Sequence, residues 1–270
     1  MEKKFEYQGR QIVYTFTGSG RRVILLHGFG EDSRVWQELA RSLEVDHRLI
    51  IPDLPGSGKS EMISDMSVEG MADAIKALLE NESAGKEEAV DMIGHSMGGY
   101  IALAFLEKYP SLLNSLGLFH STAYADTEEK KTARRKSIAF IKEKGAFEFL
   151  KTAIPNLFSP RSRQKMAAEI DNFINQQQSF IGEALIAYYE AMIARPDRRS
   201  LLEKSKIPFL FLMGKYDTAV PFSDSLEQCH LPEIAYIHIL RESAHMGMME
   251  EAGLANRILK NFLSQVQSPR

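Results

Sequence analysis

Short apolar segments alternate with helical patterns along most of this chain, and this alternation limits the possible folds more than any other feature. Apolar runs typical of buried strands occupy residues 21–30, 47–53 and 88–96. Each run is followed by a segment whose apolar residues recur at helical spacing, and Ser33 and Ser67 are the expected N-caps of the first two of these helices. Strands that alternate with helices form a parallel sheet, because a crossover helix must return the chain to the same edge. The sequence therefore predicts a doubly wound α/β fold.

The strand pattern stops after His120 and resumes near residue 206. Residues 122–205 are rich in charge and carry helical patterns, without a convincing strand. A strand pattern returns in "IPFLFLMGKYD", and a further strand and a final amphipathic helix follow. We therefore expect one core domain, formed by residues 1–121 and 206–270, that is interrupted by an all-helical insertion at residues 122–205.

The charge of the chain gives no reason to expect a nucleic-acid partner. Lys and Arg total 33 and Asp and Glu total 36, for a formal net charge of −3. Such a balance produces no broad attraction to polyanions. The basic cluster at residues 130–136 lies beside Glu128 and Glu129 and lacks interleaved aromatic residues, so we interpret it as a solvated helix face.

Cysteine content and the terminal sequence indicate the cellular compartment. The only cysteine, Cys229, cannot form an internal disulfide, which fits a reducing environment. The first residues, MEKKFEYQGRQ, are charged and lack the apolar centre of a secretory signal. No run approaches the ~18 apolar residues of a membrane helix. We expect a cytoplasmic protein without a membrane span; the sequence gives no indication of its oligomeric state.

Residues 53–60, DLPGSGKS, look like the end of a phosphate-binding loop but do not match the full pattern. That pattern places a glycine five positions before Gly58, where this chain has Asp53. It also requires a helix directly after the loop, whereas the residues after Ser60 are typical of more loop. We interpret the stretch as glycine turns that shape a loop at the sheet edge, with Lys59 solvated.

The segment Gly94-His95-Ser96-Met97-Gly98 matches G-x-S-x-G and lies between a predicted strand and a predicted helix. A very tight turn at this place would bring the backbone close to residues 94 and 98, where a side chain would collide. The turn would raise Ser96 above the sheet edge at the start of the following helix. We therefore predict that Ser96 is a nucleophile.

A serine nucleophile needs a base that takes its proton, and seven histidines compete for this role. His245 lies just past the last predicted strand, at the edge where Ser96 is expected. His27 and His95 are embedded in glycine motifs and better suit a role in shaping the backbone. His120 also ends a strand and is expected to line the site. We predict that His245 is the base.

The third group orients the histidine ring and stabilises its charged form. Asp217 follows a strand at the same sheet edge, and the order Ser96, Asp217, His245 matches a known arrangement of this constellation. Asp126, after the preceding strand, is the alternative acid. Asp224 falls within a predicted helix and is a weaker candidate.

Stabilisation of an oxyanion requires two backbone N–H donors. We expect one from Met97, after the nucleophile, and one from Phe29 in the glycine-rich loop HGFG. Met246 is an apolar neighbour of the predicted base and, with His120, a candidate for the substrate pocket. The single tryptophan, Trp36, is interpreted as a core residue. This chemistry needs no cofactor and no metal ion.

Taken together, HGFG, DLPGSGKS, GHSMGG, GKYD and SAHMGMME resemble the α/β-hydrolase superfamily, and they are spread over nearly the whole chain outside the insertion. The resemblance implies an eight-stranded, mostly parallel sheet with a helical cap inserted after the sixth strand. Relatives that cleave alkyl halides or epoxides have aspartate where this chain has Ser96. The resemblance therefore implies acyl chemistry by a serine-nucleophile, esterase-like member.

Three functions from different classes stay open at this point. The first is hydrolysis of a carboxylic ester, thioester or lactone with a small to medium apolar acyl group, with perhydrolysis as a related reaction. The second is hydrolytic cleavage of a C–C bond in a diketone by the same three residues, with His120 and the arginines of the insertion as additional polar groups. The third is a ligand receptor with little turnover. In each case the partner is a small molecule.

Overall fold

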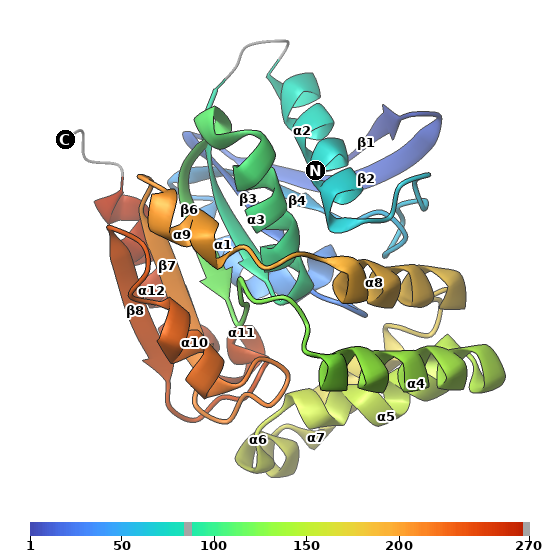
Figure 1. Ribbon diagram of the computed structural model, residues 1–270. Helices are drawn as coiled ribbons and strands as arrows, with labels where there is room; N and C mark the ends of the chain where they lie inside the picture. Colours follow the sequence, from blue (N-terminus) through green and yellow to red (C-terminus); the bar gives the residue numbers. More distant parts are fainter. Residues whose placement is uncertain (84–87, 267–270) are drawn as a thin grey trace.

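The fold is organised around an eight-stranded sheet, seen in Figure 1 as the arrows at the centre of the molecule. The computed structural model describes residues 1–83 and 88–266. The strands are β1 (Glu2–Tyr7), β2 (Arg10–Gly18), β3 (Arg21–Leu26), β4 (His47–Pro52), β5 (Val90–His95), β6 (Leu113–Phe119), β7 (Phe209–Gly214) and β8 (Ala235–Leu240). Their order across the sheet is β1-β2-β4-β3-β5-β6-β7-β8.

Helices connect the strands and form the insertion. The α-helices are α1 (Gln37–Leu43), α2 (Val68–Glu82), α3 (Met97–Lys108), α4 (Glu128–Lys144), α5 (Ala146–Ala153), α6 (Pro160–Lys165), α7 (Ala167–Asn175), α8 (Gly182–Ala194), α9 (Arg199–Lys204), α10 (Phe222–Gln228), α11 (Gly247–Glu250) and α12 (Ala252–Gln265). Three 3₁₀ helices are η1 (Ser33–Trp36), η2 (Pro110–Leu112) and η3 (Ile154–Leu157).

The sheet is mostly parallel, as predicted. Strands β3 to β8 pair in parallel, whereas β2 pairs antiparallel with both β1 and β4. Strand β1 was not predicted from the sequence. Its residues alternate between exposed and half-buried positions, so they lack the continuous apolar pattern of the central strands. A tight turn joins β1 to β2, with Gln8 and Gly9 both at positive φ, as a two-residue hairpin turn requires.

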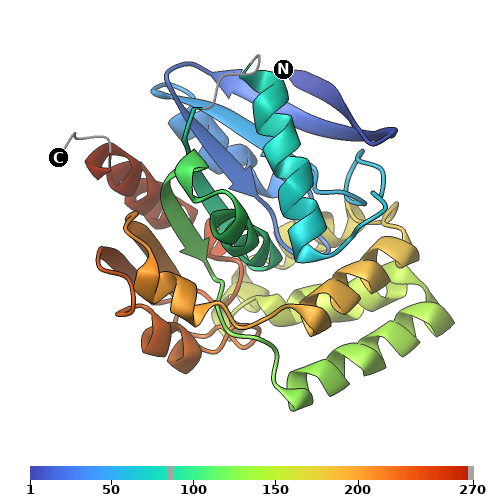
Figure 2. The same ribbon diagram turned by 45° about the horizontal axis from the view of Figure 1, so that its top comes forward.

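Helices cover both faces of the sheet, which is why its central strands are buried and mostly apolar. Strands β5 and β7 are buried at every position. Helices α2 and α3 pack side by side on one face, and α1 and α12 contact each other on the other face (Figures 1 and 2). Burial on both sides explains the unbroken apolar runs that marked these strands in the sequence.

Three local predictions about the helices can be compared with the structure. Trp36 is fully buried, as expected of a core residue. Its segment begins as the 3₁₀ helix η1, and the N-cap is Asp32, whose side chain accepts from the Arg34 N–H. The prediction that Ser33 caps this segment was wrong, because the aspartate one position earlier supplies the acceptor. At α2 the predicted cap is confirmed, since the Ser67 hydroxyl accepts from the Gly70 N–H.

The segment between β6 and β7 is helical, as predicted, and contains α4 to α9. Helix α4 packs against α5 and α8. Figures 1 and 2 show α4 to α8, in green to yellow-orange, beyond one end of the central strands. That the insertion forms a domain of its own, with boundaries at residues 122 and 205, stays a prediction.

None of the helices formed by residues 1–83 and 88–266 is both long enough and apolar enough to cross a bilayer.

Candidate active site

Ser96 lies on a strained turn between β5 and α3. Its φ of 50° is in the left-handed region, which a residue with a side chain rarely adopts without a functional reason. The Ser96 N–H donates to the Phe119 carbonyl at 3.0 Å, which ties the turn to β6. A Cβ at Gly94 would overlap the backbone at Gly98, and one at Gly98 would overlap the Leu26 carbonyl. The glycines are therefore required by close backbone contacts, as the motif predicted.

Asp217 and His245 meet at the same sheet edge. The distance from His245 Nδ1 to Asp217 Oδ2 is 2.8 Å, and both side chains are buried. The other carboxylate oxygen of Asp217 accepts from the backbone N–H groups of Ala219 and Val220, each at 2.9 Å. The aspartate is thus held in one orientation by its own loop while it contacts the histidine ring.

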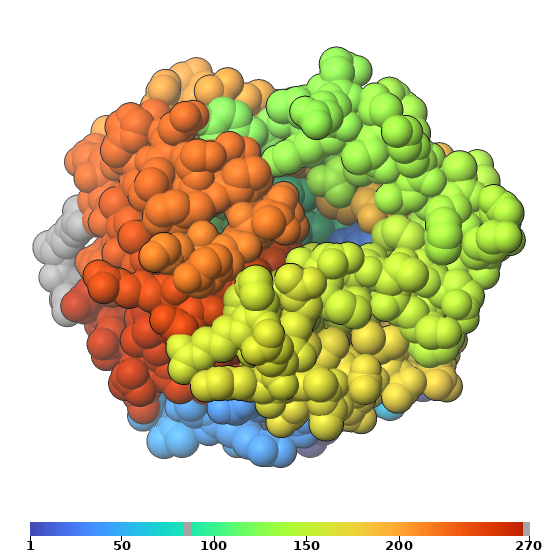
Figure 3. All heavy atoms as spheres, turned by 90° about the horizontal axis from the view of Figure 1, so that it is seen from below, coloured from blue at the N-terminus to red at the C-terminus, as the bar shows by residue number. Residues whose placement is uncertain are grey.

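A cavity of about 270 Å³ contains both Ser96 and His245 on its wall. Phe29 also lines it, and so do Tyr189 and Met192 of α8. The remaining lining residues are Glu31, Tyr100, Lys130, Ala133, Arg134, Ser137, Leu157, Thr218, Ala219 and Val220. In Figure 3 the molecule is hollowed between the green and yellow atoms of the insertion and the orange atoms that follow β7. The cavity therefore lies between the sheet edge and the insertion.

Eight of the 15 residues that line this cavity are aromatic or aliphatic, and four of these eight come from the insertion. The ring of Phe29 stacks on Tyr189, with ring centroids 4.3 Å apart, and meets Phe149 and Tyr188 edge to face. Sequence reasoning had named Phe29 and missed Tyr189 and Met192. Nothing in the helical spacing of residues 122–205 distinguishes a side chain that faces the cavity from one that faces the core.

Two residues predicted for the substrate pocket lie elsewhere. His120 and Met246 are both buried and neither is among the residues that line the cavity. The Nδ1 atom of His120 is 3.2 Å from Asp217 Oδ2 and 3.1 Å from the Gly214 backbone nitrogen, which donates to it. His120 thus packs beneath the predicted acid. It ends a strand at the correct edge, as predicted, but its side chain points into the protein instead of the pocket.

Asp126, the alternative acid, is paired with arginines and not with a histidine. Arg134 binds both of its carboxylate oxygens, and Arg195 Nη2 lies 3.0 Å from Oδ1. Asp224 lies within α10 and pairs with Lys130 at 3.5 Å. The interpretation of residues 130–136 as a solvated face was only partly right, because Lys130 and Arg134 line the cavity.

The electrostatics of the paired residues follow from their contacts. Burial works against ionisation of Asp217, but the charge of His245 and the contacts with the rings of His120 and His245 hold the pKa of Asp217 well below its usual range. For His245, burial favours the neutral ring, yet the charge of Asp217 and the hydrogen bond to it raise the pKa above the ordinary histidine value. The pair therefore favours an ionised aspartate beside a basic imidazole.

His120, Asp217 and His245 also offer ligand atoms that lie within 4.8 Å of one another, a spacing that could hold a metal ion. Asp217 Oδ2 already contacts the Nδ1 atoms of both histidines. These three atoms thus already form contacts within the cluster. The expectation that no metal and no cofactor takes part stays a prediction.

Glu31 is a charged residue of the cavity that sequence reasoning missed. It is 2% exposed and its Oε2 atom accepts from the Gly28 N–H at 2.7 Å. The same oxygen lies 3.0 Å from Nδ1 of His95, the residue before Ser96. Only its place directly after the HGFG loop could have marked it in the sequence.

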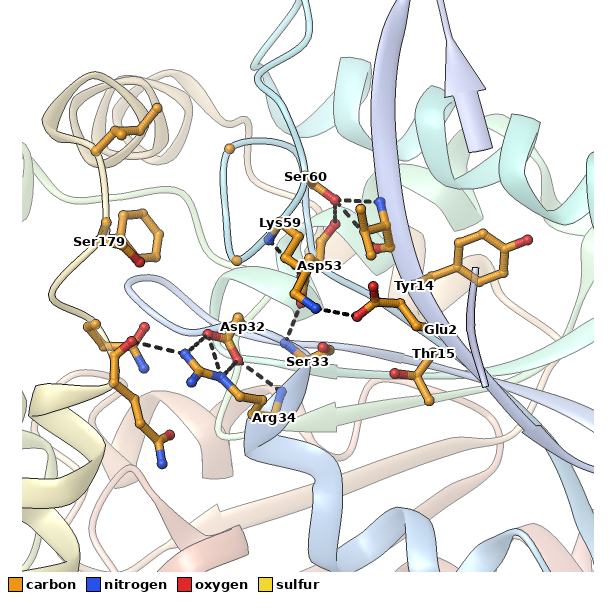
Figure 4. A pocket seen from close by; sticks show the side chains of 17 residues that line it. Glu2, Tyr14, Thr15, Asp32, Ser33, Arg34, Asp53, Lys59, Ser60 and Ser179 are labelled. Atoms are coloured by element: carbon orange, nitrogen blue, oxygen red, sulfur yellow. Dashed lines mark hydrogen bonds and ion pairs between the residues drawn. The ribbon is translucent and has the colours of Figure 1, made fainter. Parts of the chain in front are cut away.

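The DLPGSGKS loop forms part of a second cavity, of about 560 Å³, shown in Figure 4. Asp53 accepts from the backbone N–H groups of Ser33 and Lys59, each at 2.9 Å, and the Lys59 ammonium pairs with Glu2 at 2.6 Å. Gly56 and Gly58 have positive φ, as loop-shaping glycines should. The aspartate organises the loop through its side chain, which agrees with a structural role for this stretch.

His27 closes the same loop onto the sheet edge. Its Nε2 atom accepts from the Leu54 N–H at 2.9 Å, and its Nδ1 atom lies 2.8 Å from the Gly28 carbonyl. The predicted role in shaping the backbone agrees with these contacts. His27 thus links the HGFG loop after β3 to the loop after β4.

Comparison with known proteins identifies the family. The model of the α/β hydrolase fold matches residues 21–252. An esterase from Thermogutta terrifontis superimposes with a TM-score of 0.91 at 26% identity, covering 99% of this chain and 100% of the other. A 2-hydroxy-6-oxononadienedioate/2-hydroxy-6-oxononatrienedioate hydrolase from Paraburkholderia phymatum is 27% identical, over 94% of this chain and 91% of its own.

A further relative is Lipase 1 from Psychrobacter immobilis, 27% identical over 97% of this chain and 83% of its own. The protein belongs to the α/β-hydrolase fold family. Its relatives include enzymes for esters and for C–C bonds, so family membership supports a hydrolase without selecting the bond.

Proposed function

We propose that the protein is a serine hydrolase that cleaves a carboxylic ester, thioester or lactone through an acyl-enzyme. The observation that carries the proposal is the arrangement of three residues. Ser96 and His245 share the wall of one cavity, and His245 Nδ1 is hydrogen-bonded to buried Asp217 at 2.8 Å. This is the combination of nucleophile, base and orienting acid that such chemistry requires.

The proposed mechanism begins with the proton on the histidine ring. An ionised Asp217 can only accept, so Nδ1 of His245 carries the hydrogen and Nε2 is left free to take the proton of the Ser96 hydroxyl. The serine oxygen then forms a bond to the substrate carbonyl carbon. The carbonyl electrons move to its oxygen, which the N–H groups of Phe29 and Met97 stabilise.

Collapse of this intermediate breaks the bond to the alcohol, which leaves with the proton from His245. His245 then removes a proton from water, and the hydroxide that results attacks the acyl carbonyl. Ser96 recovers its proton as the acid departs. The reaction needs only water and the three side chains, together with the two backbone donors.

The cavity supports a small to medium acyl group. Its volume of about 270 Å³ is at the lower end of ligand pockets, which commonly measure 300–1,000 Å³. The aromatic residues Phe29, Tyr100 and Tyr189 are among those that line it. An apolar acyl chain would bury its surface there, at roughly 0.8 kcal/mol per methylene group.

A series of p-nitrophenyl esters from acetyl to octanoyl tests the proposal. We expect hydrolysis by the wild-type protein and a loss of at least about 10⁴-fold in kcat for Ser96→Ala, because the nucleophile is absent. Equal rates for both proteins would contradict it. A ligand that raises the melting temperature of the wild-type protein but is never consumed would favour a receptor function instead.

Hydrolysis of a C–C bond is a second candidate, favoured by cationic groups opposite the sheet edge. Lys130 and Arg134 of α4 line the cavity that contains Ser96. The P. phymatum relative is named for a substrate that carries carboxylates. Turnover of a 6-oxo-dienoate acid, followed by loss of its ultraviolet absorbance, tests this function. Rapid turnover of the acid with poor ester hydrolysis would replace the first proposal.

A further inference from the structure

A chain of two contacts connects Glu31, in the loop after β3, to the backbone of His245. The Glu31 carboxylate lies 3.0 Å from His95 Nδ1, and His95 Nε2 lies 2.9 Å from the His245 carbonyl oxygen. Glu31 and His95 are 2% and 0% exposed, so these contacts are almost entirely buried. None of these contacts belongs to the set of Ser96, His245 and Asp217.

The chemistry of the acceptors determines where the protons lie. A backbone carbonyl can only accept, so Nε2 of His95 must carry a hydrogen. The contact between Nδ1 and Glu31 then holds one more proton, either on the ring as an imidazolium beside a carboxylate or on the carboxyl as an acid beside a neutral ring. In both arrangements the pair shares a proton and carries no net charge.

The surrounding residues are built to accommodate this pair. A Cβ at Gly28 would lie 2.8 Å from His95 Nδ1 and 3.1 Å from Glu31 Oε2, so a larger residue would displace the contact. Trp36 and Phe119 pack edge-on against the ring of His95, with centroids 6.3 and 5.8 Å away. These two rings and the polar contacts at both ring nitrogens thus restrict the orientation of His95.

The contact from His95 restricts the backbone of His245, whose other polar groups also have partners. Its N–H donates to the Leu157 carbonyl of the insertion at 2.9 Å, and its Nδ1 atom contacts Asp217. His95 supplies the contact to the remaining backbone group. Without it, the short segment between β8 and α11 would lose its direct link to the turn that carries Ser96.

We propose that Glu31 and His95 are a positioning pair: their shared proton keeps His95 Nε2–H directed at the His245 carbonyl, which aligns the base with Ser96. This inference rests on the proposed function, since it assigns His245 as the base. Glu31 acts through His95 and is therefore a positioning residue, although it also lines the cavity. A small displacement of a catalytic group can lower the reaction rate by a large factor, so a pair that fixes the position of His245 would raise the rate.

Replacement of Glu31 by glutamine tests the proposal because an amide cannot reproduce these contacts. Oε2 of Glu31 serves both the Gly28 N–H and His95 Nδ1. An amide oxygen there would accept from Gly28 but repel an unprotonated Nδ1, and an amide nitrogen would donate to Nδ1 but face the Gly28 N–H. Alternatively Nδ1 takes the ring proton, and Nε2 then loses its bond to the His245 carbonyl.

We expect Glu31→Gln to lower kcat for the best p-nitrophenyl ester by roughly 10- to 100-fold, with KM within about threefold of the wild-type value. ¹⁵N spectra of protein labelled at histidine should show changed ring signals for both His95 and His245, assigned with His95→Gln and His245→Asn. A raised KM with unchanged kcat would instead make Glu31 a direct substrate contact and overturn the proposal.

Asp91→Asn provides a matched control. Asp91 is also a fully buried carboxylate with a cationic partner, Arg21 at 2.6 Å, but it lies at the opposite end of β5 from Ser96. This variant should lose stability without a change in kcat or in the ring signals of His245. If Asp91→Asn lowers kcat as much as Glu31→Gln does, the effect is general destabilisation and the pair has no positioning role.

The double variant Glu31→Gln/His95→Gln examines whether the two residues act as a unit. If they do, its kcat is no lower than that of the more damaging single variant. Losses that multiply would show independent roles and contradict the proposal. If the wild-type protein hydrolyses no ester, the proposed function fails, whereas unchanged His245 ring signals in Glu31→Gln would defeat the positioning pair separately.

Discussion

Two buried aspartates follow neighbouring strands at one edge of the sheet, but their partners differ. Asp217, after β7, contacts the rings of His245 and His120. Asp126, after β6, is held by Arg134 and Arg195. Although burial opposes ionisation in both places, the neighbouring cationic groups hold the pKa of each aspartate below its usual range.

The residue that contacts a buried carboxylate therefore decides the role of that carboxylate more than the acid itself does. An arginine stays charged at every pH the protein meets, so Asp126 forms a permanent ion pair that fixes the insertion. A histidine can lose and regain its proton near neutral pH, so Asp217 acts on a group that takes part in proton transfer. The two regions thus use the same residue type for stability and for the proposed chemistry.

The largest expected effect separates the two aspartates by activity. Asp217→Asn should lower kcat by about 10⁴-fold, because the amide no longer selects the His245 tautomer that accepts the Ser96 proton. Steady-state hydrolysis of the preferred ester measures this loss. If kcat for Asp217→Asn stays within tenfold of the wild-type value while Asp126→Asn abolishes activity, the roles assigned to the two acids are reversed.

The next effect separates them by stability. Asp126→Asn should lower the free energy of unfolding by about 3–5 kcal/mol, since it leaves buried Arg195 without its counter-charge. Urea unfolding followed by circular dichroism measures the change. The folded variant should retain kcat within about tenfold. A cost below about 1 kcal/mol would show that the arginines do not depend on this carboxylate.

The pH dependence of kcat/KM should also distinguish Asp217 from Asp126. Although burial has the opposite effect, Asp217 raises the pKa of His245, so the protonated and inactive ring persists to a pH above the ordinary value. The acid limb of kcat/KM should therefore lie above about pH 6.5, the ordinary histidine value. In Asp217→Asn this limb should move to lower pH, whereas in Asp126→Asn it should not move.

The smallest expected effect concerns Lys130, which lies on the same helix as Arg134, the partner of Asp126. Lys130 lines the cavity, and its pair with Asp224 is partly exposed, so Lys130→Ala should change the free energy of unfolding by less than about 1 kcal/mol. If the cavity accepts acidic acyl groups, KM for a p-nitrophenyl hemisuccinate should rise severalfold more than KM for the butyrate. Equal changes in both KM values would remove Lys130 from substrate recognition.

Much of the fold could be predicted from local patterns, and the exceptions have identifiable causes. The mostly apolar runs of β3 to β7 follow from burial on both faces, which leaves few positions for polar side chains. Strand β1 has no such pattern because it is a half-exposed edge, paired only with β2. Its assignment depends on that pairing.

The candidate site could likewise be predicted only in part from the sequence. The motif around Ser96 could be interpreted from the sequence because the glycines that its tight turn requires, Gly94 and Gly98, are each two positions from the nucleophile. His120 shows the limit of this reasoning: its position after β6 placed it at the correct edge, but the positive φ of 48° directs its backbone differently from that of an ordinary strand residue. No local sequence pattern indicates the direction in which such a side chain points.

By itself, the sequence determined the α/β alternation, the place of the helical insertion and the strand–turn–helix motif at Ser96, because these depend on periodicity and on steric limits within a few residues. Only the tertiary structure decided which aspartate faces a histidine, which side chains of α4 and α8 line the cavity, and that Glu31 meets His95. Those contacts join residues from 28 to 97 positions apart, and packing of the whole sheet and insertion brings them together.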